Sequence, residues 1–219
     1  MVRLASGSGD KRHALKTQHK DNLHETPPTA VRALLKAENL PNVIWEPSCG
    51  PGSIARVLRD AGHVVYATDL VDYESPDQDQ AGWDFLLEQQ LPLGVEAIVQ
   101  NPPYKLVNQF VRHSLKLCPK AYFLLRLAFL ESVGRSDILD GGKLSKVYAF
   151  KNRLPLMHRH GWTGNKTTNA IAFAWFCFDA NHSGPTELHR ISWERETSPR
   201  DTAPNYQSVA VDLETRLVP

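Results

Sequence analysis

The chain has 219 residues, of which 42% are hydrophobic and 22% are charged, and its formal net charge is +1. This length and composition suit one folded domain with a substantial core and leave little room for a second. The three cysteines, Cys49, Cys118 and Cys177, fit neither a disulfide framework nor a zinc-binding spacing. No apolar run is long enough to cross a bilayer, and residues 1–24 lack the apolar core of a signal peptide, so we expect a cytoplasmic protein.

The charges are segregated along the chain. Residues 60–96 contain nine acidic residues and no lysine or arginine, whereas residues 134–166 contain seven basic residues and two acidic ones. We therefore expect one face that repels phosphate and another that attracts it.

The two ends of the chain differ from its middle. Residues 1–22 are polar and basic and have no apolar periodicity, which predicts a disordered tail, with an arm that binds nucleic acid as the alternative. We expect a single domain over residues 23–195. Residues 196–219 are polar and predict a loose C-terminal tail.

The predicted domain begins with a helix. Thr26 is a candidate N-cap, and Pro27 and Pro28 suit the first helical turn. The apolar residues that follow have helical spacing: Val31, Leu34 and Leu35.

A strand, a glycine-rich turn, a helix and a second strand follow. The first strand is Val43–Trp45, and the turn at residues 46–53 contains glycines that allow a ligand to approach the backbone. The helix has apolar residues at Ile54, Val57, Leu58 and Ala61 and ends at Gly62. The second strand, at residues 63–68, places Asp69 at its carboxyl end, which completes a βαβ unit.

The glycine turn also fits the loose dinucleotide-binding pattern. Gly50, Gly52 and Ala55 have the required spacing, and Asp69 follows as the acidic residue. A nicotinamide or flavin enzyme is therefore an alternative. In either case Asp69 is expected to accept hydrogen bonds from ribose hydroxyls.

The next strand leads into the sequence Asn101-Pro102-Pro103-Tyr104. Residues 97–99 form a short apolar run typical of a buried parallel strand, and two prolines end it. Ligands bind at the carboxyl ends of strands in open α/β sheets. The Asn101 side-chain oxygen and the Pro102 carbonyl can accept the two hydrogens of an amine, and Tyr104 can stack on a flat group.

Taken together, these motifs resemble the class I S-adenosylmethionine-dependent methyltransferases, in particular the amino-directed branch with the DNA N6-adenine enzymes. The resemblance covers residues 25–178. It implies that Asn101, Pro102, Pro103 and Tyr104 form the catalytic signature. It also implies cofactor contacts from Thr26, Glu46, Pro47, Ser48, Cys49, Gly50, Gly52, Asp69, Leu70, Asp84, Phe85 and Asn101.

The resemblance implies a Rossmann-like α/β fold. This is a seven-stranded, mostly parallel sheet with a C-terminal antiparallel hairpin and helices on both faces. The sequence agrees, since apolar residues at 106–115 predict a helix, and strands are predicted at Ala121–Leu127, Val147–Phe150 and Ala170–Phe178.

The implied reaction is direct methyl transfer from S-adenosylmethionine to an exocyclic amine, with N6 of adenine in DNA as the expected target. No metal is expected: His158 and His160 lack further ligands at a standard spacing. The alternatives are an RNA adenine or protein glutamine-amide methyltransferase, or a cofactor-binding subunit without catalysis.

Substrate recognition departs from the family pattern. DNA methyltransferases with this motif order usually carry a target-recognition domain, but only residues 179–219 follow Phe178. We therefore expect nucleic acid, DNA more than RNA, to meet the loops at 131–145 and 151–169. The candidate contacts are Arg135, Lys143, Arg153, Arg159, Trp162 and Lys166. A flexible loop with a half-buried tryptophan is the alternative. Arg126, inside an apolar strand, is expected to pair with Glu131 or another acidic residue, and contact with a phosphate at the strand end is the alternative.

Overall fold

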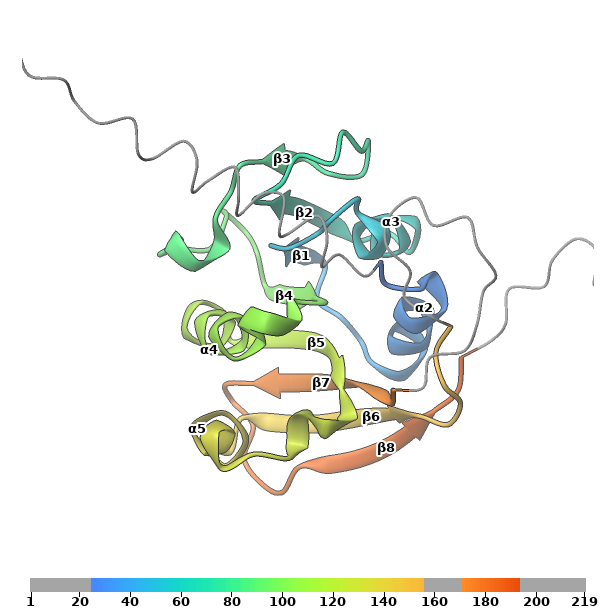
Figure 1. Cartoon of the computed structure of the whole chain (residues 1–219), viewed down its shortest axis with the longest axis vertical. Helices are drawn as coiled ribbons and strands as arrows, with labels where there is room; N and C mark the ends of the chain where they lie inside the picture. Colours follow the sequence, from blue (N-terminus) through green and yellow to red (C-terminus); the bar gives the residue numbers. More distant parts are fainter. Residues whose placement is uncertain (1–24, 156–170, 194–219) are drawn as a thin grey trace, which may run out of the picture.

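A mixed β-sheet runs through residues 25–155 and 171–193, the part of the chain that the computed structural model describes (Figure 1). Its eight strands lie in the order β3-β2-β1-β4-β5-β7-β6-β8. They are β1 (Val43–Glu46), β2 (Val64–Asp69), β3 (Gln80–Ala81), β4 (Ala97–Gln100), β5 (Lys120–Arg126), β6 (Leu144–Phe150), β7 (Phe173–Asp179) and β8 (Glu187–Ile191). All neighbours are parallel except that β7 runs antiparallel to both β5 and β6. The predicted sheet is confirmed, with one strand more than the expected seven.

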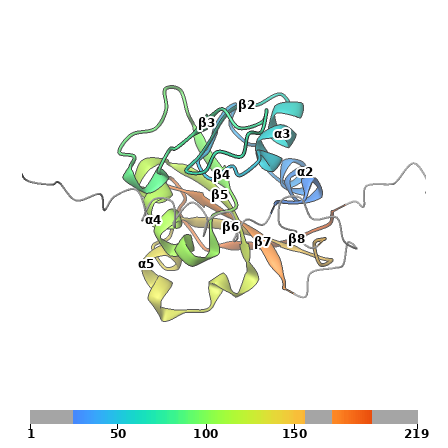
Figure 2. The same ribbon diagram turned by 45° about the horizontal axis from the view of Figure 1, so that its top comes forward.

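Helices cover both faces of this sheet, as predicted. Figures 1 and 2 show α2 (Pro28–Ala37) and α3 (Ser53–Asp60) on one side, and α4 (Val107–Leu117) and α5 (Ser136–Leu139) on the other. Adjacent strand residues point to opposite faces. Thus Ile44 belongs to the core under α2 and α3, and Trp45 belongs to the core under α4.

Four short 3-10 turns connect these elements: η1 (Phe85–Leu87), η2 (Tyr104–Leu106), η3 (Leu127–Leu130) and η4 (Val133–Arg135). The segment 131–145, which was expected to be a loop, contains η4, α5 and the first residues of β6. Most of that segment is thus regular structure.

The start of α2 differs from the prediction. Its N-cap is Pro27, which has no side chain that can accept a capping hydrogen bond. Thr26 is not the N-cap, because its hydroxyl instead accepts a hydrogen bond from Asn101 Nδ2 at 3.1 Å. A contact between residues 75 positions apart has thus replaced a local cap.

Strand β7 lies in the interior of the sheet, between β5 and β6. Its first six residues are buried, in keeping with its continuous apolar sequence. From this strand Trp175 reaches across the core, and its Nε1 donates to the Ala30 carbonyl of α2 at 2.9 Å. Strand β7 therefore joins the first helix to the last part of the sheet.

The predicted tails at 1–22 and 196–219 lie outside the described residues, as do residues 156–170. Among the helices of the described ranges, none has the length and apolar character that crossing a membrane requires.

Candidate active site

The glycine turn follows β1 and leads directly into α3. Two left-handed residues form it, Gly50 with φ of 55° and Gly52 with φ of 84°. The backbone is fixed from both sides, because Cys49 N donates to the Thr68 carbonyl at 3.1 Å and Gly52 N donates to the Cys49 carbonyl at 2.9 Å. The turn is thus attached to β2 as well as to β1.

Glu46, the last residue of β1, lies beneath this turn. It is only 1% exposed, and its Oε2 accepts a hydrogen bond from Ala55 N in the first turn of α3 at 2.8 Å. Burial raises the pKa of the Glu46 carboxyl well above its usual range, although the bond from Ala55 opposes this shift and nearby Asp69 adds to it. A buried carboxyl of this kind favours a cationic partner.

Asp69 lies at the carboxyl end of β2, as predicted. Its Oδ2 accepts a hydrogen bond from Gly50 N and its Oδ1 accepts one from Val71 N, both at 2.9 Å. The carboxylate therefore supports the glycine turn. Leu70, next to it, is half-buried.

The acidic segment between β2 and β3, which contains Asp77 and Asp79, packs against the glycine turn. A Cβ on Gly52 would lie 2.4 Å from the Asp77 Cβ, so the close neighbour that requires glycine here is part of the chain itself. Arg56 of α3 pairs with Asp77 at 3.0 Å, and Arg59 pairs with Asp79 at 2.6 Å. These ion pairs partly neutralise the acidic segment.

A buried glutamine connects the turn to α4. Gln100, at the end of β4, is fully buried. Its Oε1 accepts a hydrogen bond from Ser48 Oγ at 3.1 Å, and its Nε2 donates to Ser114 Oγ at 2.8 Å. Gln100 was not among the site residues predicted from the sequence. The signal was a polar amide that ends an apolar strand directly before the Asn101 turn.

The Asn101 side chain is held by Thr26. Because Nδ2 donates to the Thr26 hydroxyl, the planar amide has one orientation, in which Oδ1 points to the other side. Tyr104 follows in η2 and packs partly against the core under α2 and α3. Burial raises the pKa of Tyr104 to about 12 even though Arg126 lowers it, so the phenol is neutral at physiological pH.

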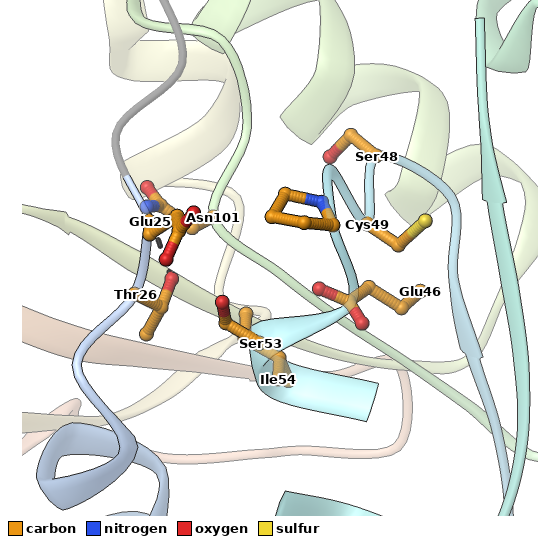
Figure 3. Close-up of a pocket in the computed structure, with 9 residues that line it drawn as sticks. Glu25, Thr26, Glu46, Ser48, Cys49, Ser53, Ile54 and Asn101 are labelled. Atoms are coloured by element: carbon orange, nitrogen blue, oxygen red, sulfur yellow. Dashed lines mark hydrogen bonds between the residues drawn. The ribbon is translucent and has the colours of Figure 1, made fainter. Parts of the chain in front are cut away.

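A small, open pocket lies where these segments meet (Figure 3). Figure 3 shows side chains that converge on it from the segment before α2, from the glycine turn with the start of α3, and from the end of β4. Its lining residues are Glu25, Thr26, Glu46, Ser48, Cys49, Pro51, Ser53, Ile54 and Asn101.

Five of these lining residues are among the predicted cofactor contacts: Thr26, Glu46, Ser48, Cys49 and Asn101. The other four were not predicted, although each is a close sequence neighbour of a predicted contact: Glu25, Pro51, Ser53 and Ile54. The thiol of Cys49 stays protonated, because burial raises its pKa far above the usual range.

Other predicted cofactor contacts lie outside this pocket. Asp84 accepts a hydrogen bond from Leu86 N at 3.1 Å and caps η1. Phe85 is 2% exposed, and its ring packs against Trp45, Phe110 and His113 with centroids 4.8 to 5.3 Å apart. Phe85 is thus a core residue on the α4 side of the sheet. Three further predicted contacts do not line the pocket but form part of the turn that borders it: Pro47, Gly50 and Gly52.

The three predicted substrate contacts that the structure describes do not form one cluster. Arg135 donates to Asn108 Oδ1 and to the carbonyls of Phe129 and Glu131, so it holds η3, η4 and α4 together. Lys143 donates to the Ala180 carbonyl at the edge of the sheet where β5 begins, opposite to Asn101. Arg153 is exposed and follows β6 at the same edge as Asn101. Arg159, Trp162 and Lys166 lie outside the described residues.

Arg126 does not have the expected partner. Its guanidinium lies 4.7 Å from the centroid of the Tyr104 ring, and in the described ranges no acidic residue pairs with it. The expected pair with Glu131 is therefore a wrong prediction. Nor do three or more His, Cys, Asp or Glu residues of these ranges gather where a metal ion could bind. His158 and His160 lie outside them.

The fold is found in known enzymes. A scan against models of protein families gives no match, and a search of curated protein sequences gives none either. Among solved structures, the chain is similar to a protein from Pyrococcus horikoshii described as an RNA methyltransferase. The TM-score is 0.54 and the identity 10%, over 79% of this chain and 98% of that one.

Two further structures have the same architecture. One is the modification subunit of a type I restriction enzyme from Vibrio vulnificus, with a TM-score of 0.52 and 12% identity over 89% of this chain. This chain spans only 55% of that subunit. The other is a class I S-adenosylmethionine-dependent methyltransferase from Listeria monocytogenes, with a TM-score of 0.51 and 14% identity, over 93% of this chain and 79% of that one. The fold is therefore the Rossmann-like class I methyltransferase fold.

Proposed function

We propose that this protein is an S-adenosylmethionine-dependent methyltransferase that modifies an exocyclic amine in nucleic acid, with N6 of adenine in DNA as its target. The observation that carries the proposal is the pocket between the glycine turn and Asn101, on a fold of the class I methyltransferases. It unites the expected cofactor turn with the residue expected to hold the amine.

The pocket suits the amino-acid end of this cofactor. The buried carboxyl of Glu46 is a partner for an ammonium group, and Ser48 and Ser53 offer hydroxyls that can donate to a carboxylate. Thr26 also lines the pocket and connects it to Asn101. When bound, the cofactor supplies an electrophilic methyl group on a sulfonium centre.

The residues of the Asn101 turn have complementary tasks. Asn101 Oδ1 and the Pro102 carbonyl accept the two N–H groups of the target amine and favour its change towards tetrahedral geometry. The bond from Asn101 Nδ2 to Thr26 keeps the amide in the orientation that this requires. Tyr104, as a neutral ring, provides a stacking surface for the target base and does not act as a base itself.

The charge distribution along this edge of the sheet supports a polyanionic substrate. Asp69, Asp77 and Asp79 lie on the β2 side, whereas Arg126 and Arg153 lie at the ends of β5 and β6. A phosphate backbone would be attracted to the β5 and β6 side. Two of the similar structures are described as an RNA methyltransferase and a restriction-enzyme modification subunit, which agrees with this substrate class. A target base in a duplex must be flipped out, and a single-stranded target avoids that cost.

The proposal is tested by transfer of labelled methyl groups from S-adenosylmethionine. The substrates are duplex DNA, single-stranded DNA, RNA and unmodified cell protein, and the product is identified after digestion. Label in methyladenine supports the proposal. Label that stays in protein after nuclease treatment would refute the proposal and favour a protein glutamine-amide methyltransferase instead. Cofactor binding without any transfer would indicate a non-catalytic subunit.

A pair of variants tests the role of Asn101. Asn101→Ala should remove most of the transfer, while the dissociation constant for S-adenosylmethionine, measured by calorimetry, stays near that of the parent. The matched control is Asn42→Ala, since Asn42 is exposed just before β1 at the opposite edge of the sheet. Equal transfer rates for both variants and the parent would refute the assignment.

A further inference from the structure

Arg126 is the last residue of β5 and lies directly over the ring of Tyr104. The guanidinium carbon is 4.7 Å from the ring centroid, and the side chain is exposed. Another part of the Tyr104 ring faces Phe173 at 6.3 Å, and the ring packs against the core. The guanidinium thus covers the aromatic surface that the proposed function assigns to the target base.

A comparison with Arg135 shows what is unusual about this arginine. Arg135 also lies over a ring, that of Phe129, at 4.6 Å. Its N–H groups are used within the fold, because they donate to Asn108 and to the carbonyls of Phe129 and Glu131. Arg135 is therefore a structural arginine.

Arg126 makes no such bonds. Within residues 25–155 and 171–193, its guanidinium lies over the Tyr104 ring, and no hydrogen bond or ion pair joins the side-chain N–H groups to the protein. A guanidinium presents five N–H donors in a plane that matches phosphate. The structure thus leaves a full set of phosphate-binding donors at the surface where the target nucleotide would lie.

The surroundings also favour an anion. Arg153, which is exposed, follows β6 at this edge. Of the described acidic residues, Asp69, Asp77 and Asp79 lie at the other end of the edge, around β2 and β3, where Asp77 and Asp79 are paired with arginines of α3. Glu25 and Glu46 line the pocket beside Asn101, on the other side of that turn from the β5 and β6 ends. A phosphate next to Arg126 would be attracted without competition from a paired carboxylate.

We propose that Arg126 is a positioning residue with two partners: it covers Tyr104 in the free protein and moves to a phosphate of the nucleic acid when the target base stacks on Tyr104. This inference rests on the proposed function and adds to it a specific substrate contact. The exchange replaces one favourable contact of the guanidinium by another and uncovers the part of the Tyr104 ring that Arg126 covers.

The test compares binding and turnover of a short adenine-containing DNA at several salt concentrations for the parent, Arg126→Gln and Arg126→Lys. Loss of one phosphate contact lowers the slope of log Kd against log salt by about 0.9 for duplex or about 0.7 for single strands. Arg126→Gln should show this smaller slope and a raised KM, with kcat changed much less. Arg126→Lys should retain the slope, because it keeps the charge.

Lys116→Gln is the matched control, since it removes the same charge from an exposed position near the end of α4. It should keep the parent slope. S-adenosylmethionine binding is measured for all variants and should match the parent. Thermal unfolding of Arg126→Gln should differ from the parent only by the small loss of the contact with Tyr104, because the Arg126 side chain makes no hydrogen bond within the described fold.

The outcomes separate this inference from the proposed function. If the parent methylates DNA and Arg126→Gln keeps the parent slope and KM, the inference is overturned and the proposed function stands. If the parent neither binds nor methylates nucleic acid, the proposed function is wrong and the inference falls with it.

Discussion

Replacement of Gly52 by alanine should destabilise the protein more than the same change at Gly62. The two glycines flank α3 and both have positive φ, 84° at Gly52 and 95° at Gly62. They differ in their surroundings. A Cβ on Gly52 would lie 2.4 Å from the Asp77 Cβ and 2.8 Å from its carbonyl oxygen, whereas a Cβ on Gly62 would have no atom within 4 Å.

The magnitudes follow from these contacts. A left-handed backbone costs alanine about 1–2 kcal/mol, and the reduced freedom of the unfolded chain returns about 0.4–1 kcal/mol, so each variant loses about 1 kcal/mol from this source. At Gly52, Asp77 must also move. This breaks the bond from Arg59 Nη1 to the Asp77 carbonyl, about 1 kcal/mol, and the part-exposed pair with Arg56, at most about 1 kcal/mol.

Gly52→Ala should therefore lose about 2–3 kcal/mol of unfolding free energy, against about 1 kcal/mol for Gly62→Ala. Urea unfolding followed by circular dichroism measures both values, and thermal midpoints should differ by about 2–8 °C. Equal losses for the two variants would show that the contact between the turn and Asp77 has no energetic importance, and would refute the reasoning.

Three other predictions concern buried residues of the site. Glu46→Gln should become increasingly stable relative to the parent as pH rises above about 4.5. Because the pKa of Glu46 is raised by folding, the folded parent still holds a proton that the unfolded chain has released. The free energy of unfolding of the parent therefore falls as pH rises through this range. Urea unfolding at pH 5 and pH 8 checks this; a difference that does not change with pH would contradict it. Gln100→Met should lose about 1–3 kcal/mol of unfolding free energy, because its hydrogen bonds to Ser48 and Ser114 disappear. It should also weaken S-adenosylmethionine binding, because Gln100 supports the glycine turn; an unchanged unfolding free energy would contradict the first expectation. Phe85→Ala should lose about 3–5 kcal/mol of unfolding free energy, while the folded protein keeps its affinity for S-adenosylmethionine, measured by calorimetry. A large loss of affinity in protein that remains folded would instead favour a contact between Phe85 and the adenine of the cofactor.

The βαβ unit around the glycine turn could be predicted because its signals are local. Apolar strands, helical spacing and glycines at positive φ all lie within residues 43–69, and the structure has the same elements within one or two residues. Strand β7 was predictable for the same reason, since its apolar run is continuous. The separate motifs predicted the pocket because parallel strands bring their carboxyl ends to one edge.

Features that depend on distant or exposed residues could not be predicted in this way. Strand β8 is mostly exposed, so its pattern of side chains carries no burial signal, and pairing with β6 holds it in the sheet. Strand β3 has only two residues, both exposed. The partners of Thr26 and Arg126 are also non-local, Asn101 in one case and Tyr104 in the other, and each prevailed over the nearby partner that sequence rules favour.

The interior position of β7 has a consequence for biosynthesis. Strands β5 and β6 are each made before β7, yet each needs β7 as its neighbour, with Lys120 opposite Asp179 and Tyr148 opposite Trp175. A nascent chain that ends before Phe173 therefore leaves the edges of β5 and β6 that face β7 unpaired, and β6 also lacks its other neighbour β8. Unpaired strand edges are the condition under which chains associate wrongly. The two parts of the sheet on either side of β7 can therefore be joined only after β7 itself has been made.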